Sequence, residues 1–246
     1  MAVMSIFANP HRFMAVSKWF AWGFSGLGAA LILFGVYQGL FIAPADYQQG
    51  DAARIMYIHV PSMWLSMFAY AFMVGASFVS IVWKHALADV AAKSAAPIGA
   101  AFTALGLITG SIWGQPMWGT WWEWGDARLV SVLILFFVFL AYMAIWQAMD
   151  TPQKAARAAA ILCLVGAINL PVIHFSVDFL NTLHQKATFF AGGEEKATIG
   201  FKAPMYTVAL GYLALFGGLT LLNMRAEIML TRAEMLAQRK QAQAAG

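Results

Sequence analysis

The chain has 246 residues, of which 61% are hydrophobic and only 11% charged, with a mean hydropathy of +0.69 and a formal net charge of +4. Because about a quarter of the residues of a soluble domain are charged, this composition excludes a soluble globular protein and indicates an integral membrane protein. The pI near 9.3 does not indicate nucleic-acid binding, since no dense cluster of Lys and Arg accompanies it.

Six apolar segments follow one another along the chain. A helix that crosses about 30 Å of hydrocarbon needs about 20 apolar residues. The six segments meet this requirement and contain no Asp, Glu, Lys or Arg; their approximate limits are 19–42, 60–83, 95–113, 129–146, 158–177 and 205–223. The first is too long for a removable signal peptide and lacks a small-residue cleavage site. We therefore predict one all-α, polytopic membrane domain over residues 1–246 with six transmembrane helices.

The distribution of Lys and Arg predicts the orientation of these helices. Ten of the basic residues lie in the termini and the even-numbered loops, against five in the odd-numbered loops, which are Arg54, Arg128, Lys186, Lys196 and Lys202. We expect both termini to be cytoplasmic and loops one, three and five to face outward, which in a bacterium is the periplasm. The tail over residues 225–246 is expected to be a cytoplasmic helix.

The third loop carries the most unusual composition. Its stretch WGQPMWGTWWEWGDARL, residues 113–129, holds five of the ten tryptophans, at Trp113, Trp118, Trp121, Trp122 and Trp124. Tryptophans at a membrane interface commonly form an aromatic belt. A belt spreads over many helix ends, however, whereas five tryptophans within twelve residues favour an aromatic platform for a large planar ligand. Composition alone leaves both interpretations open.

Two histidines are predicted on the same side of the membrane as the tryptophans. His59 stands in YIHVPSMW at the outer start of the second span, and His184 stands in FLNTLHQ beyond the outer end of the fifth. Imidazole suits iron, and haem iron takes axial ligands from histidine. This combination predicts a bis-histidine haem site. Zinc remains an alternative, because His174 and Asp178 would complete a four-ligand set.

A haem ligand would also bring two propionates, which need cations. Arg128 directly follows the tryptophans and is the best-placed candidate, with Arg54 and Lys186 next, because arginine binds carboxylates through its forked donors. The alternative for Arg128 is an arginine that snorkels from a helix end to the interface.

The single cysteine, Cys163, lies in an apolar run. One cysteine excludes an internal disulfide framework, a CxxC redox pair, a multi-cysteine metal site and the CxxCH motif of covalent haem attachment. Any haem would therefore be held without a covalent bond to this chain.

These motifs resemble a known family. WGQPMWGTWWEWGDARL is similar to the tryptophan-rich WWD segment of haem-handling membrane proteins. Together with six spans, YIHVPSMW and NLPVIHFSVDFLNTLHQ, it resembles the haem exporter protein C family of cytochrome c maturation, over nearly the whole chain. One departure is Gly125, because the family usually runs Trp directly into Asp; a local bulge at this glycine is expected to restore the register. Another is Phe179 and Leu180, where the family often has paired tryptophans.

The resemblance implies a function. Haem b would bind non-covalently and transiently at the periplasmic face of the bacterial inner membrane, with His59 and His184 as axial ligands. The platform would comprise the five tryptophans with Asp126 and Arg128. The implied partners are the haem chaperone CcmE, the ABC transporter subunits CcmA and CcmB, the small subunit CcmD and membrane lipid, but no nucleic acid.

The resemblance also implies haem binding and delivery rather than catalysis, and no catalytic residue is predicted. No GxxxxGK[ST] loop is present, consistent with an ATPase on a separate subunit. The alternatives are a permease subunit that moves haem or another small molecule, disfavoured by the absence of charged residues inside the spans, and a structural subunit that docks partners.

Overall fold

The computed structural model describes residues 10–184 and 199–245, and within them the chain is a helical bundle without named strands. Its elements are α2 (Pro10–Tyr37), a π-helical turn (Gln38–Ile42), a 3-10 turn (Asp51–Ile55), α3 (Met56–Trp83), α4 (Ala86–Trp118), α5 (Ala127–Ala148), α6 (Pro152–Gly166), α7 (Asn169–Phe179) and α8 (Ile199–Ala245). Six helical stretches are long and apolar enough to cross a membrane, as predicted. Lys186 and Lys196 lie outside the described residues.

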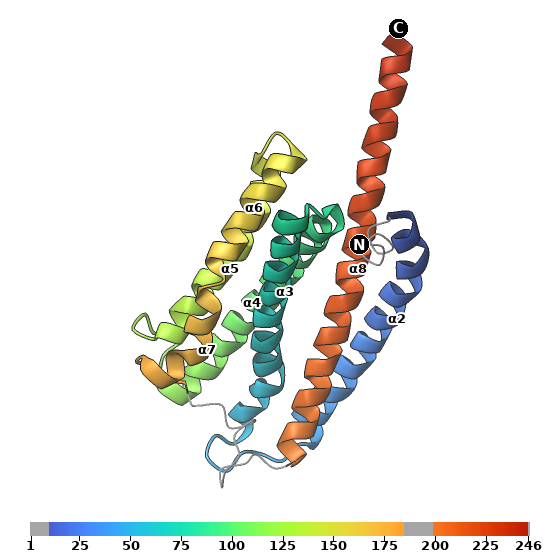
Figure 1. The fold of residues 1–246 in the computed structure, drawn as a ribbon. Coiled ribbons are helices and arrows are strands. Elements are labelled where there is room, and N and C mark those ends of the chain that lie inside the picture. Colours follow the sequence, from blue (N-terminus) through green and yellow to red (C-terminus); the bar gives the residue numbers. More distant parts are fainter. Residues whose placement is uncertain (1–9, 185–198, 246) are drawn as a thin grey trace.

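The helices are arranged around α3 and α4 (Figure 1). On one side α8 packs along α2 and also contacts α3 and α4, and on the other side α5 packs on α4 and α6 on α3. The segments 38–55, 119–126 and 180–184 lie together at one end of the bundle, here called the site end, whereas the α3–α4 and α5–α6 connections lie at the opposite end. The described parts of the odd-numbered loops thus share one end.

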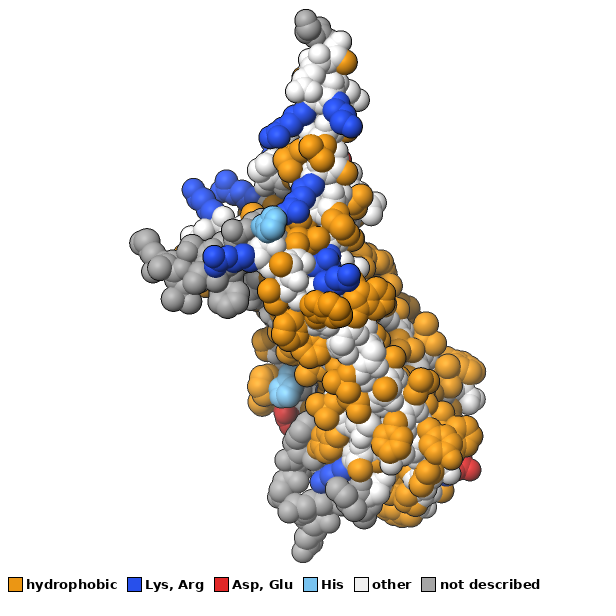
Figure 2. All heavy atoms as spheres, turned by 90° about the vertical axis from the view of Figure 1, so that its right-hand side faces the viewer, with side chains coloured by type: hydrophobic (Ala, Val, Ile, Leu, Met, Phe, Trp, Pro, Cys, Tyr) orange, Lys and Arg blue, Asp and Glu red, His pale blue; other side chains and the backbone are white. Residues whose placement is uncertain are grey.

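The opposite end carries the projecting part of α8. Figure 2 shows hydrophobic side chains over the body of the bundle and Lys and Arg side chains gathered near the base of this projection and along it. The basic residues on α8 include Arg225, Arg232, Arg239 and Lys240. The sixth span and the tail form one continuous helix.

The fifth span is broken rather than continuous. Residues 167 and 168 separate α6 from α7, so the carbonyl of Cys163 loses its helical partner; the hydroxyl of Tyr70 donates to that carbonyl instead, at 2.9 Å. Asn169 Nδ2, in the first turn of α7, donates to the Ser131 carbonyl of α5 at 2.8 Å and joins these two helices. In hydrocarbon every backbone polar group needs a partner, and side chains from neighbouring helices make the break possible.

Glycines allow α2 and α8 to approach closely. A methyl group added at Gly28 would lie 2.6 Å from the Leu215 nitrogen, and one added at Gly211 would lie 2.9 Å from the Ile32 nitrogen. Backbone atoms cannot move aside as a flexible side chain can, so this interface depends on the missing side chains.

We predict that Gly28→Ala lowers the free energy of unfolding by about 1–3 kcal/mol, the usual cost of overpacking. Thermal unfolding of the purified protein in detergent measures this. The matched control is Gly26→Ala, because a methyl group there meets nothing within 4 Å. Equal melting temperatures for the two variants would contradict the proposed contact between α2 and α8.

Candidate functional site

The tryptophan segment begins where α4 ends. Gly119 follows the last turn of α4 with a φ of 76° and donates its N–H to the Gln115 carbonyl at 3.0 Å. This left-handed conformation is the common helix stop that glycine permits. Trp113 and Trp118 are therefore the last residues of a helix, whereas Trp121, Trp122 and Trp124 belong to the irregular segment before α5.

The extra residue of this segment, Gly125, lies in a tight turn. The Asp126 N–H donates to the Glu123 carbonyl at 3.2 Å, and the Gly125 N–H donates to Glu123 Oε1 at 3.0 Å. The only residues described with positive φ are Lys84, Gly50 and Gly119, so Gly125 does not use the conformational freedom we expected of it. An exposed Glu123 side chain stabilises the turn instead.

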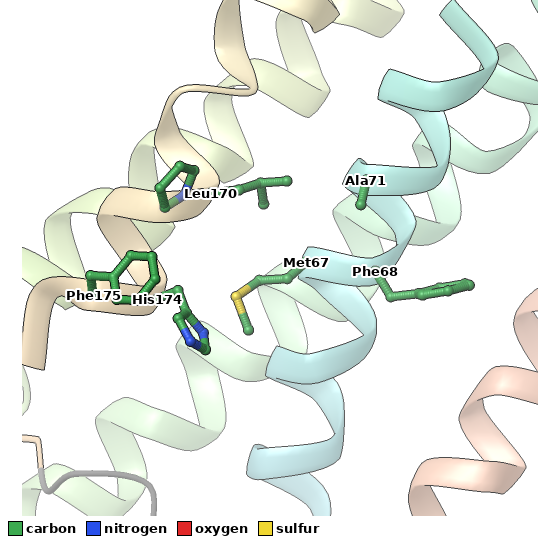
Figure 3. Close-up of a pocket in the computed structure, with 7 residues that line it drawn as sticks. Met67, Phe68, Ala71, Leu170, His174 and Phe175 are labelled. Carbon is green, nitrogen blue, oxygen red and sulfur yellow. The ribbon is translucent and has the colours of Figure 1, made fainter.

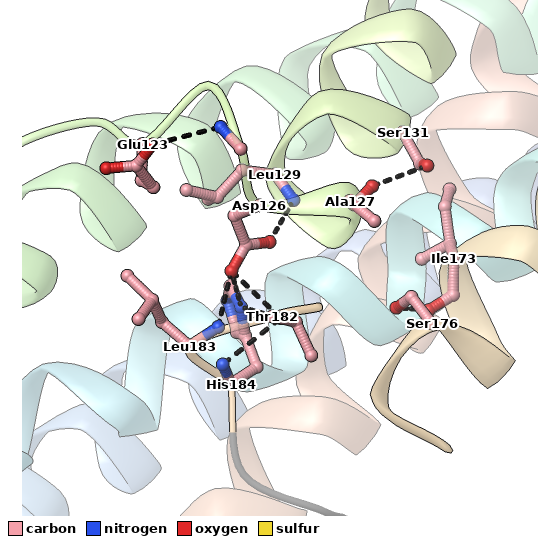
Figure 4. A network of polar contacts seen from close by, with 11 residues as sticks. Glu123, Asp126, Ala127, Leu129, Ser131, Ile173, Ser176, Thr182, Leu183 and His184 are labelled. Carbon is pink, nitrogen blue, oxygen red and sulfur yellow. Dashed lines mark hydrogen bonds and ion pairs between the residues drawn. The ribbon is translucent and has the colours of Figure 1, made fainter. Parts of the chain in front are cut away.

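Asp126 begins α5 and is the most heavily bonded side chain of the site end (Figure 4). Its Oδ1 accepts the Leu129 N–H at 2.9 Å, which makes Asp126 the N-cap of α5. Its Oδ2 accepts the Leu183 N–H at 2.7 Å and the Thr182 hydroxyl at 2.9 Å. The carboxylate therefore joins the start of α5 to the segment that follows α7.

The ionisation of Asp126 follows from these contacts. Burial by itself raises the pKa of this carboxyl, but hydrogen bonds from His184, Leu129, Leu183 and Thr182 outweigh burial and hold the pKa well below its usual range. Asp126 is consequently a buried carboxylate, stabilised by donors on two sides.

His184 is oriented by this carboxylate. Its Nδ1 lies 3.4 Å from Asp126 Oδ2 and 3.1 Å from Thr182 Oγ1. Because the Thr182 hydroxyl proton goes to the carboxylate, Thr182 Oγ1 accepts from His184, so Nδ1 carries the imidazole proton. The lone pair of neutral His184 is then on Nε2, which remains available to a ligand.

His59, like His184, is oriented by acceptors around its Nδ1, but these acceptors are different atoms. Its Nδ1 lies 3.0 Å from the Gly106 carbonyl of α4 and 3.2 Å from Thr109 Oγ1. A carbonyl can only accept a hydrogen bond, so Nδ1 is the donor and Nε2 carries the lone pair. Gly110 leaves room for this ring, because a methyl group there would lie 2.9 Å from His59 Cε1.

Aromatic rings flank both histidines. Trp113 meets the His59 ring edge-on with centroids 5.7 Å apart, and Trp118 meets the His184 ring with centroids 5.0 Å apart. The Trp113 indole N–H also donates to Gln49 Oε1 at 3.1 Å, which ties the first loop to the site. Two of the five tryptophans thus restrict the orientation of the histidine rings.

The other three tryptophans do not form one flat surface. Trp122 and Trp124 contact each other at 5.5 Å with their planes 68° apart. Trp124 is 73% exposed and Trp121 is 61% exposed. Large apolar side chains that are exposed together commonly mark a surface that binds a ligand or a partner. These two rings are available to a ligand or a partner.

The predicted cations differ in their contacts. Arg54 donates to the carbonyls of Gly39 and Ala43, at 3.1 and 2.8 Å, and to Asp51, so it is committed to the end of the π-helical turn. Arg128, in the first turn of α5, has no hydrogen bond or ion pair within the described part of the chain. It interacts electrostatically with His59 and with Asp126.

His59 and His184 lie close enough to interact electrostatically with each other. His174 lies apart from them, on α7. Over residues 10–184 and 199–245 no three side chains of His, Cys, Asp or Glu are grouped to hold a metal ion, so the four-ligand zinc arrangement is not assembled there. Phe179 and Leu180, where the family often has paired tryptophans, are exposed.

Comparison with known proteins gives consistent matches. The family model described as heme exporter protein C matches residues 3–239. The heme exporter protein C of Bradyrhizobium diazoefficiens is 53% identical over 229 residues, which are 93% of this chain and 86% of that protein. Those of Escherichia coli K12 and Paracoccus denitrificans are 44% and 41% identical, over 91% and 95% of this chain and 89% and 97% of theirs.

We predict that Asp126→Asn removes a pH dependence of stability. Because the folded pKa lies below the unfolded value of about 3.9, the carboxylate stabilises the fold fully above about pH 5 and loses this contribution as the pH falls further. Urea unfolding of the wild type between pH 6 and pH 3 should show the loss, and Asp126→Asn should be less stable by about 1–3 kcal/mol at pH 6 and flatter below it.

The control for this experiment is Asp150→Asn, on the exposed connection between α5 and α6. It should retain the wild-type pH profile. A steep acid-induced loss in the Asp126 variant, equal to that of the wild type, would show that other carboxyls govern the profile.

Proposed function

Because the chain belongs to the haem exporter protein C family, we propose that it binds haem b non-covalently at its site end and delivers it to the periplasmic haem chaperone CcmE. The family supports a role in haem handling for cytochrome c maturation by a multi-pass membrane protein. The observation that carries the finer proposal is the pair of histidines whose Nδ1 atoms both donate, so that two Nε2 atoms are free for iron.

The residues present fit a haem. His59 and His184 would be the axial ligands, since histidines that ligate a metal generally donate their other ring N–H to a carbonyl or carboxylate. Arg128 has unused donors for a propionate. Trp121 and Trp124 offer exposed aromatic area to the porphyrin, while Trp113, Trp118 and Trp122 support the rings around it. Asp126 would act through His184 rather than on the haem.

The two proposed ligands differ in how strongly each imidazole would donate electrons to iron. A buried carboxylate near Nδ1 makes His184 the stronger electron donor to a metal, whereas His59 has only neutral acceptors. His59 is the weaker donor of the two, and we propose that its bond to iron is the one released first at delivery. The protein binds, orients and releases; the covalent bond to haem forms on the chaperone.

Further elements of the proposal are location and partners. The excess of Lys and Arg opposite the site end favours a periplasmic site in the inner membrane. The ATPase function would reside in CcmA with CcmB as its membrane partner, and CcmD would be an additional small subunit.

The ligand assignment predicts that the purified protein has the visible spectrum of six-coordinate, low-spin haem, and that His59→Ala and His184→Ala each abolish it because one axial bond is lost. The control is His85→Ala, at the opposite end of the bundle. Unchanged haem content and spectrum in both site variants would refute the assignment.

The delivery step predicts a second result. The double variant Trp121→Ala/Trp124→Ala should fold normally, because both side chains are exposed, yet should trap less haem with the co-expressed chaperone on co-purification. The matched control is Trp19→Ala/Trp83→Ala, which removes two equally exposed tryptophans, 78% and 53%, from the other end of the bundle. Equal loss in both double variants would show that general interface anchoring, not the site, is responsible.

A further inference from the structure

The hydroxyl of Thr182 lies between the Asp126 carboxylate and the His184 ring (Figure 4). Its Oγ1 is 2.9 Å from Asp126 Oδ2, 3.1 Å from His184 Nδ1 and 3.1 Å from the His184 backbone nitrogen. The His184 Nδ1 atom lies farther from the carboxylate itself, at 3.4 Å. Because N–H···O hydrogen bonds commonly fall between about 2.7 and 3.2 Å, the well-formed hydrogen bond of this ring is the one to Thr182.

The hydrogen bonds of Thr182 use the whole capacity of its hydroxyl. A threonine hydroxyl has one proton to donate and two lone pairs that accept. The carboxylate of Asp126 only accepts, so it receives the hydroxyl proton, and the two lone pairs accept the backbone N–H and the ring N–H of His184. Each bond therefore has a fixed direction. A chain of hydrogen bonds runs from His184 through Thr182 to Asp126, and in such a chain each bond polarises the next.

Thr109 lies beside His59 in a similar way, but it is not the principal acceptor there. Its Oγ1 is 3.2 Å from His59 Nδ1, whereas the Gly106 carbonyl is only 3.0 Å away. The Thr109 hydroxyl donates to a carbonyl of its own helix at 2.7 Å, as threonines within helices often do. Loss of this hydroxyl would leave His59 bonded to Gly106. Loss of the Thr182 hydroxyl would leave the His184 ring with no acceptor at normal distance among the described residues.

His174 offers a contrast to both of these histidines. Figure 3 shows its ring directed into the space between α7 and α3. The described residues that line this groove carry neither a hydroxyl nor a carboxyl group. A hydroxyl held beside the ring therefore distinguishes His59 and His184 from His174.

From these contacts we infer that Thr182 is a positioning residue for His184: its hydroxyl keeps the imidazole proton on Nδ1 and transmits the charge of Asp126 to the ring. Thr182 itself touches neither iron nor porphyrin in this proposal. The part that concerns the tautomer involves this chain alone. The part that concerns the strength of the iron bond rests on the function proposed above, in which His184 is an axial ligand. Hydrogen bonds to a ligand tune its donation to the metal, and stronger donation favours iron(III) over iron(II).

The first test uses the full, haem-free protein in lipid nanodiscs and the NMR signals of its isotopically labelled imidazole nitrogens. In the wild type we expect His184 to carry its proton on Nδ1 only. Thr182→Val should give a mixture of the two tautomers, and Thr182→Ser should restore the wild-type signals because it restores the hydroxyl. The signals of His174 are the internal reference and should not move. A His184 ring that stays wholly protonated on Nδ1 in Thr182→Val overturns the inference.

The second test measures the reduction potential of iron in the haem-loaded protein. We expect Thr182→Val to lower the ratio of ferric to ferrous haem affinity about tenfold, which raises the potential by about 59 mV. The matched comparison is Thr109→Val, which removes a hydroxyl beside the other histidine and should shift the potential less, because the Gly106 carbonyl remains. Equal shifts in the two variants would show that Thr182 has no special role.

A double-mutant cycle tests the transmission of charge. If Asp126 acts on His184 through Thr182, Asp126→Asn shifts the potential in the wild type but adds little in the Thr182→Val background. Two shifts that simply add would mean that the carboxylate acts on the ring directly, contrary to the inference. Failure of the haem assignment has a different signature: His184→Ala would leave the haem spectrum unchanged, while the tautomer result in the haem-free protein would stand.

Discussion

The buried carboxylate of Asp126 is the contact on which the site end depends. It starts α5 through Leu129 and fixes the segment after α7 through Thr182 and Leu183. Two elements far apart in sequence are thus held by one side chain, and its charge is stable only because donors surround it. His184 owes both its position and its tautomer to this arrangement, so local folding and ligand binding share one interaction.

The opposite histidine is held by packing rather than by charge. His59 sits in the first turn of α3, where Gly106 offers a carbonyl and Gly110 offers space. Such a ring cannot shift without moving α3 against α4, whereas His184 sits in a short irregular segment. Of the two proposed ligands, His59 is rigid and has a neutral hydrogen-bond partner, whereas His184 is adjustable and has a charged one. A protein that must hold a cargo and then release it needs this kind of inequality, because two equally strong bonds would oppose release.

The sequence predicted the fold well because hydrocarbon imposes a simple length requirement on apolar segments. It did not predict the break at residues 167 and 168, although Gly166 and Pro171 flank it, because the break depends on the Tyr70 hydroxyl of another helix. The sequence named both histidines and Asp126 as candidates for the site, but it did not indicate that Thr109 and Thr182 contact the two imidazoles. A hydroxyl has no recognisable pattern until folding brings it beside an imidazole. The bonds of Arg54 were not predictable for a similar reason, since its carbonyl partners are set by a π-helical turn that the sequence did not indicate.

The tryptophans of the segment 113–129 have separate roles. Trp113 and Trp118 end α4 and pack edge-on against the two histidines, so their rings limit where each imidazole points. Trp124 is exposed on the tight turn that Asp126 closes, and Trp121 is exposed just before this turn. An aromatic belt would need only exposed tryptophans, and a buried core would need only packed ones. One segment supplies both kinds of tryptophan, and it ends at Asp126, whose carboxylate orients His184. The exposed aromatic surface and the position of the His184 ring are therefore coupled. The extra residue, Gly125, is accommodated in the turn between Trp124 and Asp126, where its N–H donates to Glu123 Oε1.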